Sequence, residues 1–466
     1  MQEFDGYTLF TPFSPEEEEI TTIFIDNDHH IIHTWSHNSF PASMPYLLPD
    51  SSIIYPYTVE SPSMIAGGVG GGIQKLSWDG TVIWNYILAD TTYQHHHDIE
   101  PLPNENVLII AWEKKTIDEA YDMGRSDILE WSFNEMWSTA ILELNPSSGL
   151  IVWEWHLWDH LVQDVYHELP NFGIIDDYPE LFDINCGSVG NSSGGPQSPN
   201  GDWMHINAID YNPDLDQIVI SSRLQSELYI IDHSTTTEEA ASHEGGNSGK
   251  GGDILYRWGN PQNYNRGDSS DKILAAQHSV NWIPNDYPGE GNLILFNNFH
   301  EQDHSFSIEL TTPIDSSGNY IISDDNPFGP TTLEWEFMCD MIIPVQGGSF
   351  RLPNGNTIIT LTHIGKIIEV DDNGNNVWEY TYTTNHIDNY WIARANKYSL
   401  DYFQNIILGD INGDEILNVL DIVLMINMIL SNEYSIVADV NEDGYIDVLD
   451  VVLMVNILVG GLPQSN

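Results

Sequence analysis

The stretch Ile73-Gln-Lys-Leu-Ser-Trp-Asp79-Gly80-Thr-Val-Ile-Trp84 contains a strand, an Asp-Gly turn and a second strand that ends in Trp. An Asp-Gly pair between apolar runs is a strong short-range signal for a β-hairpin. The same unit recurs along the chain with turns of different length. Its six copies are Ile23–Trp35, Ile73–Trp84, Ile141–Trp155, Leu228–Trp258, Ser307–Trp335 and Ile367–Trp378.

A second hairpin alternates with the first and has a strongly apolar second strand. Its five copies are Tyr46–Tyr57, Ile99–Trp112, Ala208–Arg223, Val280–Asn298 and Ser349–Thr362. One hairpin of each kind makes a four-stranded sheet. Placing the strand-like segment Asn389–Lys397 beside the N-terminal hairpin completes a sixth sheet and closes a ring without exposed edges. We therefore predict an all-β, six-bladed β-propeller over residues 1–404, while the irregular spacing leaves five, seven or eight blades open.

Residues 405–466 differ in kind, because they contain no Lys or Arg and carry a twelve-residue loop twice. Each loop has oxygen ligands at positions 1, 3, 5, 9 and 12 and a backbone carbonyl at 7, the pattern that Ca²⁺ requires. The predicted metal ligands are Asp410, Asn412, Asp414, Ile416, Asn418, Asp421, Asp439, Asn441, Asp443, Tyr445, Asp447 and Asp450. An apolar helix follows each loop. We predict a small α-helical domain with paired EF-hand-like loops and two Ca²⁺ sites.

Three histidines fall at equivalent places in three consecutive blades. His97 and His278 lie six residues before the Pro of the following turn, and His205 lies eight before it. Equivalent positions in a propeller converge on its axis. Arg223, one of only six arginines, ends the hairpin that His205 begins. Three imidazoles suit Zn²⁺, but an Arg beside them repels a cation, so a tetrahedral anion held by Arg and His is the better interpretation.

The charge of the chain is strongly negative, with 13 Lys and Arg against 70 Asp and Glu, a net charge of −57. Such a shortage of bases excludes nucleic acid as a partner and disfavours anionic membrane surfaces. No apolar run reaches the roughly 20 residues that span a bilayer. Cys186 and Cys339 are too few for a disulfide framework, which leaves buried thiols or one long-range disulfide. No signal peptide opens the chain, so the protein is either cytosolic or a mature form.

Residues 7–400 resemble the bacterial arylsulfate sulfotransferases, a family of six-bladed propellers. The resemblance is carried by Asp26-Asn27-Asp28, His33-Thr34-Trp35, His96-His97-Asp98, Trp158-Asp159-His160, Asp202-Trp203-Met-His205-Ile-Asn207, Ile231-Asp232-His233, Tyr256-Arg257-Trp258, Gln277-His278 and Arg351-Leu-Pro-Asn-Gly-Asn-Thr357. It implies transfer of a sulfuryl group from an aryl sulfate to a phenol without a nucleotide cofactor.

The resemblance also implies roles for particular residues. His278 would be the nucleophile that becomes a sulfohistidine. His97, with His96 as the alternative, would complete the catalytic set together with His205 and Arg223. Three further residues are expected to contact the substrate. They are His96, Asn207 and Gln277.

Residues 405–466 resemble a type I dockerin, so we expect an extracellular or cell-surface protein, with the periplasm as a further option, and a cohesin-like partner. Loop positions 10 and 11, which help dockerins bind their partner, are apolar here: Val419-Leu420 and Val448-Leu449. Glu415 replaces the Gly expected at position 6 of the first loop, which weakens that site.

A second hypothesis keeps the propeller fold without activity, as a Ca²⁺-dependent subunit of an extracellular filament, tube or surface layer that associates through the C-terminal module. Its basis is that Ser279, Asn281 and the segment 341–350 depart from the family pattern. The charge of −57 would also repel a sulfate ester.

Overall fold

The computed structural model describes most of the chain. The described residues are 2–458, except 17–18, 127–133, 191–199, 302–303, 316–317, 324–325, 385–389, 403–408, 412–416, 432–436 and 442–444. The predicted boundary between residues 404 and 405 falls outside them and stays a prediction.

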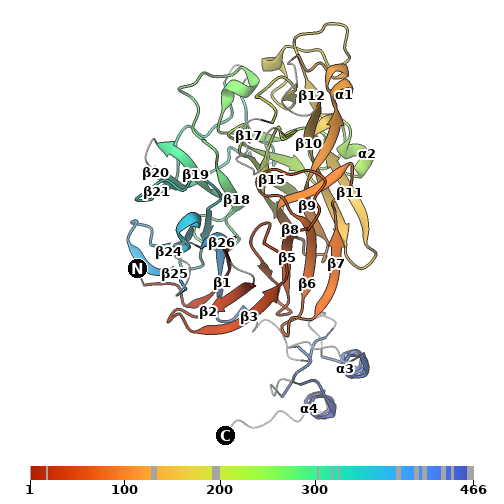
Figure 1. The fold of residues 1–466 in the computed structure, drawn as a ribbon, viewed down its shortest axis with the longest axis vertical. Coiled ribbons are helices and arrows are strands. Elements are labelled where there is room, and N and C mark those ends of the chain that lie inside the picture. The colour runs from red at the N-terminus through yellow and green to blue at the C-terminus, as the bar shows by residue number, and fades with distance from the viewer. Residues whose placement is uncertain are drawn as a thin grey trace.

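Six four-stranded antiparallel sheets form the blades of a propeller, as the repeats predict (Figure 1). Blade one consists of β26 (Trp391–Ser399), β1 (Gly6–Phe13), β2 (Ile20–Ile25) and β3 (Ile31–His37). Blade two consists of β4 (Tyr46–Leu47), β5 (Ile53–Thr58), β6 (Gly71–Leu76) and β7 (Val82–Ile87). Blade three consists of β8 (Tyr93–Pro101), β9 (Val107–Thr116), β10 (Glu135–Asn145) and β11 (Leu150–His156).

The second half of the ring repeats this order. Blade four consists of β14 (Ile206–Asn212), β15 (Gln217–Ser222), β16 (Glu227–Asp232) and β17 (Tyr256–Trp258). Blade five consists of β18 (His278–Trp282), β19 (Leu293–Glu301), β20 (His304–Leu310) and β21 (Trp335–Met338). Blade six consists of β22 (Gly348–Arg351), β23 (Thr357–Leu361), β24 (Lys366–Val370) and β25 (Asn376–Thr381).

The ring closes where the end of the propeller meets its beginning. β26 pairs antiparallel with β1, from Gly6 opposite Ser399 to Phe13 opposite Trp391, and Figure 1 shows the blue strand beside the red one. The predicted closing segment is therefore confirmed. β1, which no repeat covered, is the strand that joins it to the N-terminal hairpin. Sharing one blade between the two ends closes the ring and gives both ends of the propeller a place in a four-stranded sheet.

The connections between strands contain short helices and one small sheet. They are α1 (Ile117–Asp122), α2 (Thr237–Ala240), η2 (Leu157–Asp159), η3 (Ile175–Asp177), η4 (Pro261–Tyr264), η5 (Thr362–Ile364) and the parallel pair β12 (Leu161–Val162) and β13 (Phe182–Asp183). The C-terminal module contains α3 (Val419–Ser431) and α4 (Val448–Leu458). Within the described part of the chain, no helix combines the length and the apolar character needed to cross a membrane.

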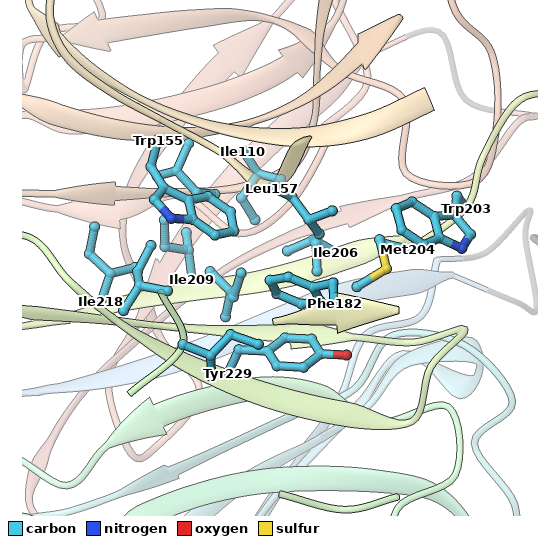
Figure 2. Close-up of a cluster of buried hydrophobic side chains, with 14 of the residues drawn as sticks. Ile110, Trp155, Leu157, Phe182, Trp203, Met204, Ile206, Ile209, Ile218 and Tyr229 are labelled. Carbon is cyan, nitrogen blue, oxygen red and sulfur yellow. The ribbon is translucent and has the colours of Figure 1, made fainter. Parts of the chain in front are cut away.

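Apolar side chains fill the space between neighbouring blades. Between blades three and four, Trp155, Phe182 and Tyr229 pack with aliphatic side chains from both sheets (Figure 2). The inner strand of each blade is thus held by packing on both faces, which fixes the side chains that face the axis.

Both cysteines are free thiols, and burial raises the pKa of each to about 12.

A cavity of about 360 Å³ lies where the inner strands end, and two of the carboxyls that line it belong to Glu100 and Asp210. Burial, with the charge of Asp98, raises the pKa of Asp210 to about 7. Burial and the charges of Asp210 and Asp98 hold the pKa of Glu100 well above its usual value. The folded protein therefore binds more protons here than the unfolded chain does.

This raised pKa predicts how stability depends on pH. Between the ordinary Asp pKa of 3.8 and about 7, the folded state holds the extra proton, so stability falls as pH rises through that window. Asp210→Asn is expected to raise the free energy of unfolding by about 2–4 kcal/mol at pH 8 and by less than about 1 kcal/mol at pH 4. Denaturant unfolding at both pH values measures this, with the exposed Asp214→Asn as control. An equal effect of Asp210→Asn at both pH values would contradict it.

Candidate functional site

The three histidines predicted from the repeats lie on the innermost strands of blades three, four and five. His97 is in β8, His205 directly precedes β14, and His278 begins β18. Each strand pairing shifts its register at this place: between His95 and Ile99, between Ile206 and Ala208, and between His278 and Asn281. A β-bulge of this kind redirects a side chain and is common beside active sites.

Backbone dihedrals show the same feature. His97 and His205 have φ values of 54° and 51°, and Ser279, next to His278, has 61°. Positive φ is unfavourable for residues other than glycine and persists only where the surrounding structure enforces it. The strain recurs at one level of three consecutive blades, which marks this level of the axis as the candidate site.

The structure brings the three histidines together in a buried cluster. The rings of His97 and His205 are 4.6 Å apart and meet edge to face at 74°. All three side chains are at least 95% buried. Burial, together with the charges of His205, His96 and His278, holds the pKa of His97 well below its usual value. At neutral pH, His97 is therefore a neutral imidazole.

His278 is also neutral, and its tautomer follows from its partners. Burial and the positive charge of Arg223 hold its pKa well below the usual value. Its Nδ1 lies 2.8 Å from Oδ1 of Asn298, whose amide nitrogen donates to the carbonyls of Ile343 and Gln346. Because both amide hydrogens are used, Oδ1 must accept, so Nδ1 of His278 carries the proton. Nε2 keeps its lone pair, which accepts the backbone N–H of Gln346 over 3.3 Å.

His205 is oriented by a carboxylate that the sequence did not single out. Asp202 is fully buried, and its Oδ2 accepts a hydrogen bond from Nδ1 of His205. The indole N–H of Trp112 donates to Oδ1 of Asp202 over 3.1 Å. Arg223 is close to this pair, since its backbone N–H donates to the His205 carbonyl over 3.2 Å. Burial lowers the pKa of Arg223, and the charge of Asp202 opposes this only in part.

The three residues predicted to contact the substrate are fully buried and bonded to other groups of the protein. His96 stacks on Trp112 with ring centroids 4.0 Å apart, and its Nδ1 lies 2.9 Å from Nδ1 of His97. The Asn207 amide donates to the Gln277 carbonyl over 2.7 Å. The Gln277 amide nitrogen donates to Ser221 and to the carbonyls of Ser222 and Glu227 in blade four. These bonds join the inner strands of blades four and five.

A buried ion pair crosses the axis and was not predicted. Arg394 of β26 pairs with Asp98 of β8, and its other terminal nitrogen donates to the Asn207 carbonyl over 2.6 Å. Asp98 also accepts hydrogen bonds from the hydroxyls of Ser43 and Tyr46. The charge of Arg394 acts on both His97 and His278. The signal was available, since Arg394 is another of the six arginines in a base-poor chain.

The glycine-rich run at residues 67–72 packs against the cluster. Gly68 has a φ of 74°, and its carbonyl accepts the His97 N–H over 2.7 Å. A Cβ on Gly68 would lie 2.1 Å from Nε2 of His97. This backbone therefore covers one side of the imidazole.

The residues that depart from the family pattern contact one another. The Asn281 amide donates to the Ser349 carbonyl over 2.9 Å, and the Ser349 N–H donates to Oγ of Ser279 over 3.4 Å. The segment 341–350 also supplies the carbonyls that fix Asn298 and the N–H that reaches His278. The departures are therefore mutually complementary, and this segment forms part of the site.

Comparison with known families places this site in context. The family described as Arylsulfotransferase (ASST) matches the chain over residues 58–318, which is more than half of its length. This range contains His97, His205, Arg223 and His278. The chain belongs to the arylsulfotransferase family. Among curated proteins, none matches the chain.

Several solved structures are similar to this arylsulfotransferase-family chain. A protein of unknown function from Bacteroides caccae is 12% identical, with a TM-score of 0.41 over 84% of this chain and 98% of that one. A putative 6-phosphogluconolactonase from Bacteroides fragilis is 7% identical, with a TM-score of 0.39 over 85% and 99%. Virginiamycin B lyase from Staphylococcus aureus is 12% identical, with a TM-score of 0.35 over 82% and 85%. These values support no conclusion about activity.

The C-terminal module of this arylsulfotransferase-family chain matches the type I dockerin domain over residues 408–459, which implies calcium binding. Its two loops are built alike: Asp421 accepts the N–H groups of Ile411 and Asn418, and Asp450 accepts those of Asn441 and Asp447. The predicted ligands Asn412, Asp414, Ile416 and Asp443 lie outside the described residues.

The donor set of this module fits a hard cation. Four acidic side chains of the two loops are buried, with 8%, 0%, 3% and 0% of their surface exposed: Asp410, Asp421, Asp439 and Asp450. No Lys or Arg occurs after residue 397 to offset their charge. Buried carboxylates need a compensating charge, and oxygen ligands of this kind suit Ca²⁺.

Proposed function

We propose that the protein transfers a sulfuryl group from an aryl sulfate to a phenol, through a covalent intermediate on His278. The observation that carries this proposal is the neutral His278 imidazole, which lies in a buried cluster with two further histidines and feels the charge of Arg223. Its Nε2 keeps a lone pair, and attack requires the 3.3 Å hydrogen bond from the Gln346 N–H to give way. A neutral imidazole is a competent nucleophile near pH 7, and the positive charge beside it favours an anionic group.

In the first half-reaction, Nε2 of His278 attacks the sulfur of the aryl sulfate and forms an N–S bond. The S–O bond to the aryl group breaks, and its electron pair leaves with the aryl oxygen. Arg223 is proposed to bind the sulfuryl oxygens, and His97 to donate to them from the opposite side. His205, oriented by Asp202, is the proposed acid that gives the leaving oxygen a proton.

In the second half-reaction, His205 takes the proton of the phenol, whose oxygen attacks sulfur as the N–S bond breaks. The proton on Nδ1 of His278 assists this step, because the sulfurylated ring then carries a positive charge and is a better leaving group. Oδ1 of Asn298 accepts a hydrogen bond from this Nδ1–H over 2.8 Å and so stabilises the charged ring. The proposed role of Asn207 and Gln277 is to hold the inner strands in register, and that of His96 is to orient His97.

Kinetics with p-nitrophenyl sulfate and phenol test this proposal. A covalent intermediate predicts parallel double-reciprocal plots when the phenol concentration is varied, because the first product leaves before the acceptor reacts. Intersecting plots would indicate direct transfer, and no release of nitrophenol would remove the proposed activity.

Two glycine-to-alanine substitutions, both at positions with positive φ, test the assigned position of His97 in the site. Gly68→Ala is expected to lower kcat/KM at least about tenfold, because the new methyl group meets the His97 ring at 2.1 Å. Gly80→Ala is the matched control, since Gly80 also has a positive φ, of 83°, and nothing lies within 4 Å of its added Cβ. Steady-state rates of both variants decide the question, and equal losses would contradict the assigned position of His97.

For the C-terminal module we propose two Ca²⁺ sites and docking to a cohesin-like domain in an extracellular assembly. Apolar residues at loop positions 10 and 11 are exposed in both halves, with exposed fractions of 69%, 51%, 67% and 61%: Val419, Leu420, Val448 and Leu449. A face of this kind suits an apolar partner surface. Sedimentation of the full chain with and without EGTA tests the alternative, self-association, which predicts Ca²⁺-dependent oligomers without any partner.

A further inference from the structure

We propose that His160, His243 and Asp253 bind a divalent transition-metal ion, with Zn²⁺ as the reference ion, away from the axial site. One ligand atom of each residue lies within 4.8 Å of the other two. His160 follows η2 in the connection after blade three, whereas His243 and Asp253 lie in the insertion between β16 and β17 of blade four. The ion would join two segments that are far apart in the chain.

The carboxylate oxygen is the centre of the cluster. Oδ1 of Asp253 lies 2.8 Å from Nδ1 of His160 and 2.7 Å from Nδ1 of His243. His160 is fully buried and the Asp253 side chain is 9% exposed, whereas that of His243 is 61% exposed. The cluster is thus anchored inside the protein and accessible to solvent from the His243 side.

Both ring nitrogens of His160 face oxygen atoms, and Nδ1 faces the carboxylate. Its Nε2 lies 2.8 Å from the carbonyl oxygen of Ala240, which can only accept, so Nε2 carries a proton. In a neutral ring, Nδ1 then presents its lone pair to the carboxylate oxygen 2.8 Å away, so either a second ring proton or a metal ion between the two atoms is needed for attraction. A histidine that donates its other N–H to a backbone carbonyl is the usual arrangement at a metal ion, because that bond fixes the ring.

The surroundings hold the ligands in place. Trp155, seen in Figure 2, lies parallel to the His160 ring at 5.8 Å, and its indole N–H donates to the Gly252 carbonyl over 2.8 Å. A Cβ on Gly252 would lie 2.6 Å from Nε2 of His160 and 2.0 Å from the Ala240 carbonyl. Glycine therefore allows the Asp253 backbone to approach the imidazole closely.

A cavity of about 490 Å³ opens on the same cluster. It is lined by Tyr178, Glu180, Leu181, His243, Lys250 and Asp253. Burial raises the pKa of Glu180, and the Asp253 charge adds to this effect. The carboxyls of Glu180 and Asp253 outnumber the single ammonium of Lys250, so the cavity is favourable for a cation. The cavity also leaves room for water or a small ligand at an open coordination position of the metal.

The ligand types select the ion. Two imidazole nitrogens and one carboxylate oxygen suit Zn²⁺ and its first-row neighbours, whereas Ca²⁺ takes oxygen ligands. Metal bonds of about 2.0–2.1 Å in a tetrahedron place ligand atoms about 3.3 Å apart. The contacts of 2.7 and 2.8 Å would open by about half an ångström on binding, which the exposed His243 ring permits.

Metal binding to tag-free full-length protein tests the proposal. Calorimetry with Zn²⁺, in buffer with millimolar Ca²⁺ to saturate the C-terminal loops, should show a tight site, and Co²⁺ should give the visible absorption of a tetrahedral complex. His243→Ala should weaken this site at least about 100-fold and remove the Co²⁺ spectrum. Asp253→Asn should weaken it as well.

His167→Ala, at an exposed histidine outside the cluster, is the matched control and should bind as the wild type does. Because His243 is exposed, its variant is expected to fold, which far-UV circular dichroism checks. Wild-type protein without a tight Zn²⁺ site, or equal affinity in His243→Ala and wild type, would overturn the proposal.

Discussion

Replacing His278 with Ala is expected to lower the rate of nitrophenol release from p-nitrophenyl sulfate by at least about 10³-fold. The variant loses the nitrogen that forms the N–S bond, and no described side chain offers a second nucleophile in the same place. His97 lies near, but its ring is held between Gly68 and His205. The loss should appear in kcat as well as in kcat/KM, because the missing interaction exists only in the reacting complex.

His167→Ala serves as the control for His278→Ala, because it removes a histidine outside the inner strands without touching the cluster. Circular dichroism and the thermal midpoint should be similar in both variants. A His278→Ala rate within tenfold of the wild type would show that the nucleophile is another residue.

Withdrawal of Ca²⁺ is expected to unfold the C-terminal module and leave the propeller intact. Its apolar core is small, formed around Met425, Ala438, Val440 and Met454, and the four buried carboxylates repel one another without a cation. Each site stabilises the folded module by about 4 kcal/mol when free Ca²⁺ exceeds the dissociation constant 1,000-fold. Hydrogen exchange with and without EGTA should therefore show loss of protection over α3 and α4 and no change in the blades.

Asp450→Ala should weaken protection of α4 even in saturating Ca²⁺, because its carboxylate fixes the N–H groups of Asn441 and Asp447. Asp372→Ala, at an exposed turn of the propeller, is the matched control and should have no effect on the module. Protection of both helices that survives EGTA would contradict the proposed role of the ions.

The repeats predicted the fold well because each blade needs the same two hairpins. Alternating apolar strands and their turns recur locally, so six blades and the closing strand could be inferred. The strand β1 was not predicted, because it belongs to no repeated hairpin. It gains a place in a sheet only by pairing with β26, which is far away in the sequence. Ring closure is a long-range event without a local signal.

The site was only partly predictable, for a similar reason. Register placed His97, His205 and His278 at one level, since it depends only on spacing within each hairpin. Asn298 and Asp202 act through hydrogen bonds to particular side chains and backbone groups, and such bonds leave no periodic trace in the sequence. Arg394 was overlooked, although the scarcity of bases that drew attention to Arg223 applies to it equally.

The net charge of the chain differs from the balance of charged groups near the propeller axis. Near the axis, Arg223 and Arg394 add positive charge beside the histidines. These two cations offset the neighbouring carboxylates of Asp98 and Asp202, so the net charge of −57 does not describe the charge at the cluster.

Mass spectrometry of the enzyme after rapid mixing with p-nitrophenyl sulfate, without an acceptor, tests the central claim most directly. The account predicts that the protein gains the mass of one SO₃ group, that the label lies on the peptide containing His278, and that phenol removes it. A label on another residue, or steady nitrophenol release without any labelled protein, would contradict a sulfohistidine at His278.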